Sequence, residues 1–168
     1  PDGRLSSGRA GSFEGSVSGA FEAVADTLPI MLWRCDADGR CTFFNRQWLA
    51  FRGRAIKDEL GWGWLEGLPE EDRAACRETF QEARQRQGPF TIEYRLRRAD
   101  GQFRWILGHG SPCLGARGEL AAYIGSAADI TDRQERLVAL AKSEQSFRLL
   151  IENAEDMVYR YRLVPTRA

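Results

Sequence analysis

The side chains that could do chemistry in this sequence are few and widely spaced. The four cysteines, Cys35, Cys41, Cys76 and Cys113, include no C-x-x-C pair, and His109 is the only histidine. A zinc site needs thiolates or imidazoles at close spacing. The pattern therefore predicts no metal site, and it favours reduced, mostly buried thiols.

The acidic residues do not form a catalytic group either. Glu70, Glu71 and Asp72 lie at the start of an expected helix, where carboxylates stabilise the positive end of the helix dipole. The sequence contains no phosphate-binding G-x-x-x-x-G-K-[ST] loop, and its single histidine leaves no convincing pair of nucleophile and base. We therefore expect no catalytic residues in this chain.

The balance of charge excludes some partners. The 168 residues include 24 basic and 24 acidic side chains, so no net field attracts nucleic acid or an anionic membrane. No apolar run approaches the roughly 18 residues of a membrane span, and no signal-peptide pattern is present. We expect a soluble, cytoplasmic segment without membrane contact, whose parent protein could be anchored elsewhere.

The elements that position these residues follow from apolar periodicity and turn residues. Residues 1–19 are rich in Gly and Ser and are expected to form a flexible linker. A helix at 20–28 precedes a hairpin of "IMLWRC" and "CTFFN", and Asn45 is a good N-cap for the next helix. A helix at 69–87 and three meandering strands follow. The order indicates an α+β domain with one antiparallel sheet and helices on one face.

The end of the sequence repeats its beginning. Residues 21–34, "FEAVADTLPIMLWR", align without gaps with residues 147–160, "FRLLIENAEDMVYR", and share the phenylalanine, the methionine and the final arginine. Internal repetition indicates tandem copies of one fold. The second copy would comprise only a helix and a first strand within 147–168, so we expect the chain to be a piece of a longer protein.

Four stretches in order resemble a known family. The stretches "DADGRCTFFN", "GWGWLEGLPEEDR", "EYRLRRADGQFRW" and "YIGSAADITDRQ" together resemble a PAS domain with its C-terminal PAC portion, of the kind common in bacterial sensor kinases and diguanylate cyclases. The resemblance assigns a sensor domain to 20–131, a helical signalling linker to 131–147 and the start of a second PAS domain to 147–168. It implies a five-stranded antiparallel sheet, an N-terminal helix, a C-terminal exit helix and an enclosed small-molecule cavity. Where the family usually reads "HPDD", this chain has "LPEED".

The resemblance also bears on the cofactor, which stays unknown. The positions where light-sensing LOV domains orient a flavin with Asn, Asn and Gln correspond here to Leu96, Ile106 and Ala127, and no "NCRFLQ"-like stretch is present. The helix at 69–87 lacks the axial histidine of oxygen-sensing haem domains. LOV-type flavin and His-ligated haem are therefore disfavoured, and a flavin held differently stays open.

Large side chains are expected on both faces of the sheet. Trp62 and Trp64 either line the mouth of a cavity or pack in the core. Trp105 and Leu107 alternate onto the outer face with His109, which calls for a cover by the N-terminal helix, a partner subunit or both. The candidates for contact with a small ligand are Trp62, Trp64, Tyr94, Leu96, Ile106, Tyr123 and Ala127.

The last strand passes directly into a helix. Thr131 and Gln134 form a capping-box pattern, and in the family the carboxylate and hydroxyl of "DIT", here Asp129 and Thr131, link strand to helix. We expect these three residues to relay the state of the sheet. Leu137 and Leu140 have a/d-like spacing, which favours a parallel homodimer; a helix lying on its own or the next domain is the alternative.

These patterns together predict a non-enzymatic sensory module. It would bind a small ligand or cofactor, or mediate dimerisation, and would signal to an output domain of the same chain. That output would be a histidine kinase of a two-component system or a diguanylate cyclase/phosphodiesterase. The alternative is a ligand-free dimerisation and spacer module whose own Trp and Phe side chains fill the cavity.

Overall fold

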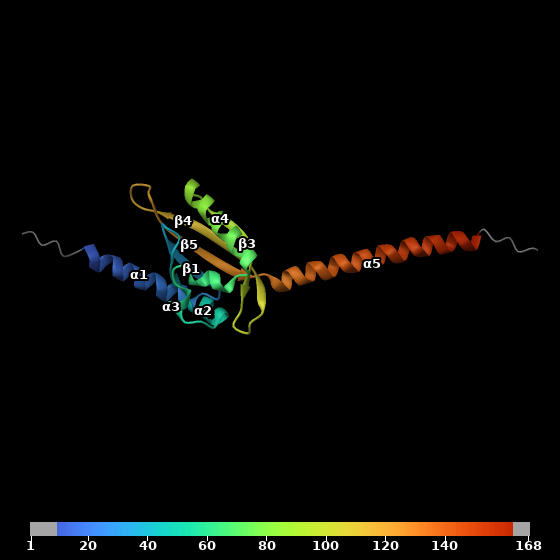
Figure 1. Cartoon of the computed structure of the whole chain (residues 1–168), viewed down its shortest axis with the longest axis horizontal. Coiled ribbons are helices and arrows are strands. Elements are labelled where there is room, and N and C mark those ends of the chain that lie inside the picture. The colour runs from blue at the N-terminus through green and yellow to red at the C-terminus, as the bar shows by residue number, and fades with distance from the viewer. Residues whose placement is uncertain (1–9, 163–168) are drawn as a thin grey trace, which may run out of the picture. The chain divides into compact units, whose positions relative to one another are not determined.

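The computed structural model describes residues 10–162, with side chains from residue 19 to residue 151. The chain divides into two compact units, with the boundary between Asp129 and Ile130. The second unit contains α5 (Thr131–Arg162). The first contains α1 (Ala10–Thr27), β1 (Met31–Asp36), β2 (Cys41–Phe44), α2 (Arg46–Arg52), α3 (Ile56–Glu59), the 3-10 helix η1 (Gly63–Gly67), α4 (Glu70–Arg86), β3 (Phe90–Arg97), β4 (Phe103–Leu114) and β5 (Leu120–Asp129), as Figure 1 shows.

The five strands form one antiparallel sheet in the order β2-β1-β5-β4-β3. The last strand, β5, lies at the centre and pairs with β1 on one side and β4 on the other. The α+β architecture predicted from the sequence is therefore confirmed. No helix within residues 10–162 is both long and apolar enough to cross a membrane.

The hairpin of β1 and β2 is closed by its own turn. The Oδ1 atom of Asp36 accepts hydrogen bonds from the backbone N–H groups of Asp38 and Arg40, both at 2.9 Å. Gly39 has a φ of 87°, and a Cβ at this position would collide with the ring of Phe80. The predicted hairpin of "IMLWRC" and "CTFFN" is thus confirmed, and a glycine is required in its turn.

Asn45 connects three elements through one buried amide. Its Oδ1 atom accepts hydrogen bonds from the backbone N–H of Trp48 at 3.1 Å, as an N-cap does, and from that of Leu32 at 2.9 Å. Its Nδ2 atom donates to the backbone oxygens of Ala25 and Ile30 at 2.9 and 2.8 Å. The side chain therefore fixes the start of α2, the last turn of α1 and the start of β1.

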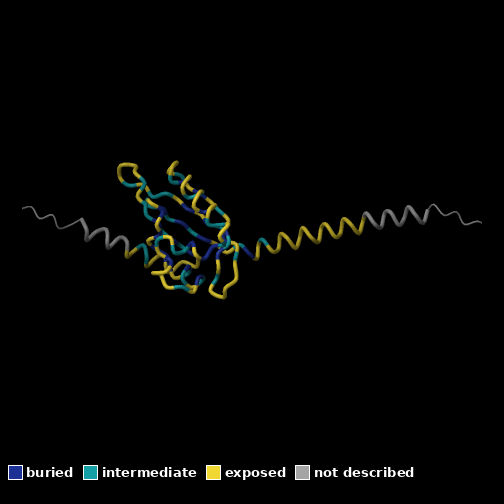
Figure 2. The backbone as a smooth tube through the Cα atoms, in the orientation of Figure 1, coloured by how far each residue is buried: buried dark blue, intermediate teal, exposed yellow. Residues whose placement is uncertain are grey.

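Strand alternation separates an inner from an outer face, as the sequence predicts. Leu96 of β3 and Ile106 of β4 are fully buried, whereas Trp105 lies on the opposite face and is 39% exposed. The helices between β2 and β3 pack on the inner face, with Trp48 of α2 and Ala83 of α4 in the same core cluster. Figure 2 shows this core as the dark blue segments of the sheet and the helices beside it.

The N-terminal helix is longer than expected. It begins at Ala10, so the predicted flexible linker over residues 1–19 is wrong from residue 10 onward. No proline interrupts the segment 10–27, and a helix can therefore extend by local hydrogen bonds despite its glycines. Residues 1–9 lie outside the described part of the chain.

The C-terminal helix is also longer than expected. It runs without interruption to Arg162, so residues 157–160, expected to form the first strand of a second domain, are helical. A lone strand would leave its backbone groups unpaired, whereas a helix satisfies them locally. Within residues 10–162 no second PAS domain is therefore shown, and residues 163–168 lie outside the described range.

Candidate functional site

The inner side of the sheet contains a cavity of about 50 Å³. Its lining consists mainly of aromatic rings, aliphatic groups and cysteine side chains. The lining residues are Trp33, Cys35, Gly39, Cys41, Phe44, Trp48, Trp62, Trp64, Leu65, Cys76, Arg77, Phe80, Phe90, Ile92, Tyr94 and Gly108. This space holds a few waters or a molecule of similar size, whereas cofactor-sized ligands occupy about 300 Å³ or more. As packed, the cavity does not fit a flavin or a haem.

Three of the seven predicted ligand-contact residues line this cavity. They are Trp62, Trp64 and Tyr94, and Trp62 reaches the surface with 41% of its area exposed. The other four lie in the surrounding core and do not line the cavity: Leu96, Ile106, Tyr123 and Ala127. The lining residues that sequence reasoning missed come mostly from β1, β2 and α4. Alternation in "IMLWRC" was the available signal for Trp33 and Cys35.

Trp64 contributes an unused hydrogen-bond donor to the lining. Its ring meets those of Trp48 and Tyr94 edge-on, at centroid distances of 6.4 and 6.0 Å. Its indole N–H is buried without a hydrogen-bond partner among the described residues, which is uncommon for a buried donor. Burial raises the pKa of the Tyr94 phenol, which therefore stays neutral.

Three of the four cysteines also line the cavity, although their spacing did not indicate it. Cys35 and Cys41 are joined as a disulfide, so the expectation of reduced thiols is wrong for this pair. The hairpin places the two residues directly opposite each other, which their separation in sequence conceals. Cys76 and Cys113 are free thiols, and burial raises the pKa of Cys76 to about 12. Within the described residues no group of metal-binding side chains occurs.

Tyr123 connects the central strand with α4. Its hydroxyl lies within hydrogen-bond distance of the backbone oxygens of Ala83 at 2.8 Å and Gly88 at 3.0 Å. These carbonyls belong to the C-terminal end of the helix and the residues just after it, and the Ala83 oxygen also accepts from the backbone N–H of Gly88 at 3.0 Å. Burial raises the pKa of the phenol, so the hydroxyl keeps its proton. The contact ties β5 to the helix that covers the cavity.

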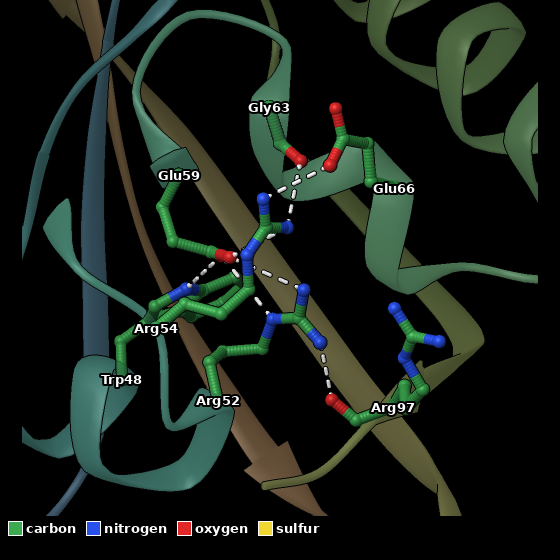
Figure 3. A network of polar contacts seen from close by, with 7 residues as sticks. All are labelled: Trp48, Arg52, Arg54, Glu59, Gly63, Glu66 and Arg97. Carbon is green, nitrogen blue, oxygen red and sulfur yellow. Dashed lines mark hydrogen bonds and ion pairs between the residues drawn. The ribbon is translucent and has the colours of Figure 1, made fainter. Parts of the chain in front are cut away.

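A buried polar network, drawn in Figure 3, shares Trp48 with the cavity lining. Its centre is Glu59 of α3, which is fully buried. The carboxylate accepts hydrogen bonds from Trp48 Nε1 at 2.9 Å and from Nε and Nη2 of Arg52 at 3.2 and 3.1 Å. Arg52 also donates through Nη1 to the backbone oxygen of Arg97. The network therefore joins α2, α3 and the end of β3.

A second arginine completes this network towards the surface. Nη1 of Arg54 lies 3.2 Å from Glu59, and Nη2 lies 2.9 Å from the exposed Glu66. Sequence reasoning missed the network because Glu59 and its arginines look like ordinary surface residues of short helices. Arg52 and Glu59 pair with each other in the interior, so we assign the network to the support of the helical insert.

The acidic start of α4 holds the neighbouring strand. Asp72 accepts from the backbone N–H of Arg95 at 2.8 Å and from its Nε and Nη2 atoms at 3.0 and 2.7 Å. Glu71 accepts from the same guanidinium at 2.9 Å. These hydrogen bonds lower the pKa of Asp72. The guanidinium also lies 5.8 Å from the ring centroid of Trp105, so it covers part of the outer face.

The N-terminal helix covers a different part of the outer face. Phe21 of α1 meets Phe43 of β2 with ring centroids 5.6 Å apart. Leu107 of β4 is half-buried. In the second unit, Leu137 and Leu140 of α5 are 54% and 57% exposed in the single chain.

The predicted relay residues lie at the end of β5 and the start of α5. The Oδ2 atom of Asp129 accepts a hydrogen bond from Nε of Arg104 on β4 at 2.8 Å. In α5, Thr131 is buried, and the backbone N–H of Gln134 donates to the oxygen of Ile130 at 2.9 Å. Sequence reasoning named the three relay residues and missed Arg104, which only the register of β4 against β5 reveals.

Comparison with known proteins gives a consistent result. A family model described as PAS fold (PAS_3) matches residues 42–127. An uncharacterized protein of Sinorhizobium fredii, y4lL, is 36% identical over 123 residues, which are 71% of this chain and 15% of that protein. The chain thus spans about one seventh of the length of this curated relative.

Solved structures show the same fold. An RNA-binding light-oxygen-voltage receptor superposes with a TM-score of 0.64 at 24% identity, over 84% of this chain and 41% of that one. A sensory box histidine kinase/response regulator from Burkholderia thailandensis superposes with a TM-score of 0.57 at 25% identity, over 76% of this chain and 97% of that one.

Proposed function

The chain belongs to the PAS family, and we propose that it is a non-enzymatic sensory module that passes changes in its sheet to α5. From α5 the signal would reach an output domain of the same protein. The sensory context rests on the family match over residues 42–127. The observation that carries the relay is the position of β5, the central strand of the sheet, which is followed by α5 after a single residue.

The contacts of β5 support this role. Tyr123 connects the strand to the end of α4, which lines the cavity through Cys76 and Phe80. Asp129 is held at the other end of the strand by Arg104. A change at the cavity that moves α4 would therefore pull on the strand that directly precedes α5 in the chain. With no flexible loop between strand and helix, little of such a movement would be lost.

The input is a molecule of the size the cavity admits. A volume of about 50 Å³ and an aromatic lining favour a small uncharged molecule with a hydrogen-bond acceptor for Trp64. A ligand shifts the module only if it binds one arrangement more tightly than the other.

The same small volume favours the second candidate function, a spacer that binds no ligand. Native mass spectrometry of the purified chain separates the two, because only a sensor would retain a small molecule.

The output would work in pairs. Leu137 and Leu140 are exposed apolar residues on α5, and we propose that they pair with the same residues of a second copy. Sedimentation of the whole chain should give the mass of two copies, and a double change of both leucines to lysine should give one. A histidine kinase output is supported by the similarity to the sensory box kinase; a diguanylate cyclase is the other class the sequence favours.

Hydrogen exchange tests the relay without knowledge of the stimulus. The change Arg104→Ala removes the guanidinium that donates to Asp129 and alters no residue of α5 itself. We expect faster amide exchange in the first turns of α5. The matched control is Arg98→Ala, which breaks the 2.5 Å pair with Asp100 in the exposed turn between β3 and β4. Equal exchange of α5 in wild type and both variants would reject the relay.

A further inference from the structure

The cavity contains a pair of cysteines in direct contact. Cys35 of β1 and Cys41 of β2 face each other in the antiparallel register, and both are almost fully buried. The backbone N–H of Cys41 donates to the oxygen of Gly61 at 3.0 Å, and the Cys41 oxygen accepts from the N–H of Gly61 at 2.7 Å, so the Cys41 N–H does not donate a ladder hydrogen bond to Cys35. Cross-strand pairs without mutual hydrogen bonds bring side chains closest together. The backbone therefore preorganises the two sulfur atoms for a bond.

A purely structural cross-link would gain little at this place. The two cysteines are separated by six positions in sequence, and the stabilisation from a disulfide grows with the length of the loop it closes. The turn is already closed by the hydrogen bond from the Asp36 N–H to the Arg40 oxygen at 2.9 Å and by the Asp36 carboxylate. This location is therefore better explained by chemistry at the sulfur atoms than by stability.

The cavity gives a small oxidant a place next to the pair. Cys35 and Cys41 line it, and so do Trp62 and Arg77, both exposed, which extend the lining to the surface. The unpartnered indole N–H of Trp64 is a donor for an oxygen atom. Hydrogen peroxide has two heavy atoms, so a space that holds a few waters accommodates it.

We propose that Cys35 and Cys41 form a redox site that hydrogen peroxide oxidises from a dithiol to a disulfide. One thiolate attacks a peroxide oxygen, the O–O bond breaks, and the sulfur becomes a sulfenic acid as hydroxide leaves. The second thiolate then attacks this sulfur, the S–S bond forms, and the sulfenic oxygen leaves as hydroxide. The two hydroxides take up the two protons that the thiols released when they ionised. In sum, two thiols and one peroxide give one disulfide and two waters, so two electrons pass from sulfur to oxygen.

The other cysteine of the cavity provides an internal control. Cys76 lines the same space but has no cysteine opposite it, and its high pKa keeps it protonated at neutral pH. Cys113 of β4 lies outside the lining. The proposal of a redox site depends only on the hairpin and the cavity. It can therefore be correct even if the relay proposed above is not.

The test is peptide mapping of the whole 168-residue chain after reduction and treatment with an equal amount of hydrogen peroxide. Trypsin cleaves after Arg34, Arg40 and Arg46, so the two cysteines fall in peptides 35–40 and 41–46, which stay together only through a disulfide. We expect these peptides to appear linked and the thiol count of the chain to fall from four to two. Four remaining thiols, or a link that involves Cys76 or Cys113 instead, would overturn the proposal.

Cysteine variants, and a comparison of the folded with the unfolded chain, test the assignment of the two cysteines further. Cys76→Ser and Cys113→Ser should still lose two thiols, whereas Cys41→Ser should lose the linked peptides. Tryptophan fluorescence reports whether each variant is folded. If Cys41→Ser does not fold, the wild type in urea replaces it. The unfolded chain should then link 35–40 to 41–46 more slowly than the folded chain, and equal rates would show that the fold does not build the site.

Discussion

Glu59 gives the sharpest energetic test of the structure. The change Glu59→Gln keeps the shape of the side chain and removes its charge. It leaves Arg52, with 1% of its side chain exposed, and the partly buried Arg54 without their shared carboxylate. The neutral amide oxygen can still accept from Trp48. The substitution therefore isolates the charge at the centre of the network.

The expected loss follows from the burial of these groups. Two unit charges about 4 Å apart interact by about 4 kcal/mol at an effective dielectric constant of about 20. The buried Arg52 loses the whole of this interaction with the Glu59 carboxylate. Solvent screens the interaction of the partly exposed Arg54 with Glu59, so that second pair adds little. Removal of one partner from a buried ion pair costs about 3–5 kcal/mol. We expect Glu59→Gln to lower the free energy of unfolding by about 4 kcal/mol, a large part of the about 5–15 kcal/mol typical of a domain.

Urea titration followed by tryptophan fluorescence measures this loss. All five tryptophans lie between residues 33 and 105, so the signal reports the first unit and not α5. The matched control is Glu66→Gln, which removes an exposed carboxylate from the same Arg54 and should cost less than about 1 kcal/mol. If Glu59→Gln unfolds at the same urea concentration as Glu66→Gln, the buried charge does not stabilise the insert and our reasoning fails.

Three further outcomes follow from the same contacts. Tyr123→Phe should lower the free energy of unfolding by about 0.5–1.5 kcal/mol in urea titrations, because the hydrogen bond that the hydroxyl donates to a carbonyl at the end of α4 is lost; an unchanged midpoint would contradict the contact. Since Arg95 lowers the pKa of Asp72 in the folded state, this carboxylate stabilises the fold fully above its ordinary pKa of 3.8 and loses that effect as the pH falls through the lower, folded-state value. Asp72→Asn should therefore be less stable than wild type at pH 7 and nearly equal to it at the acid end of a pH series; a constant difference would refute the pairing. Because burial raises the pKa of Cys76 to about 12, iodoacetamide at pH 8 should label the half-buried Cys113 well before Cys76 in the reduced native chain, and faster labelling of Cys76 would show that it is not buried.

The cavity shows how far reasoning from sequence alone could reach. Tyr94 was placed correctly on the inner face because strand alternation is a local property of β3. Whether an inner residue lines a cavity or packs solidly depends on the helix that lies over it. Leu96 shares its face with Tyr94 and is buried outside the lining, since the covering groups leave space only above part of the sheet.

Two of the errors concern pairing between strands. Residues 157–160 match a strand by sequence yet are helical, because a strand needs a partner strand and a helix does not. Cys35 and Cys41 look scattered until the hairpin register places them opposite each other. In each case the deciding interaction joins positions that no local pattern relates.

Local patterns in the amino-acid sequence were enough to predict several features of the first unit: the alternation of β4, the hairpin of β1 and β2, the cap at Asn45 and the α+β order. These depend on the geometry of a few consecutive residues, which local side chains control. The tertiary structure alone decided the cysteine pair, the burial of Glu59 between two arginines, and the pairing of Arg104 with Asp129. Such contacts require strand register and helix packing, whose energies come from residues far apart in the chain.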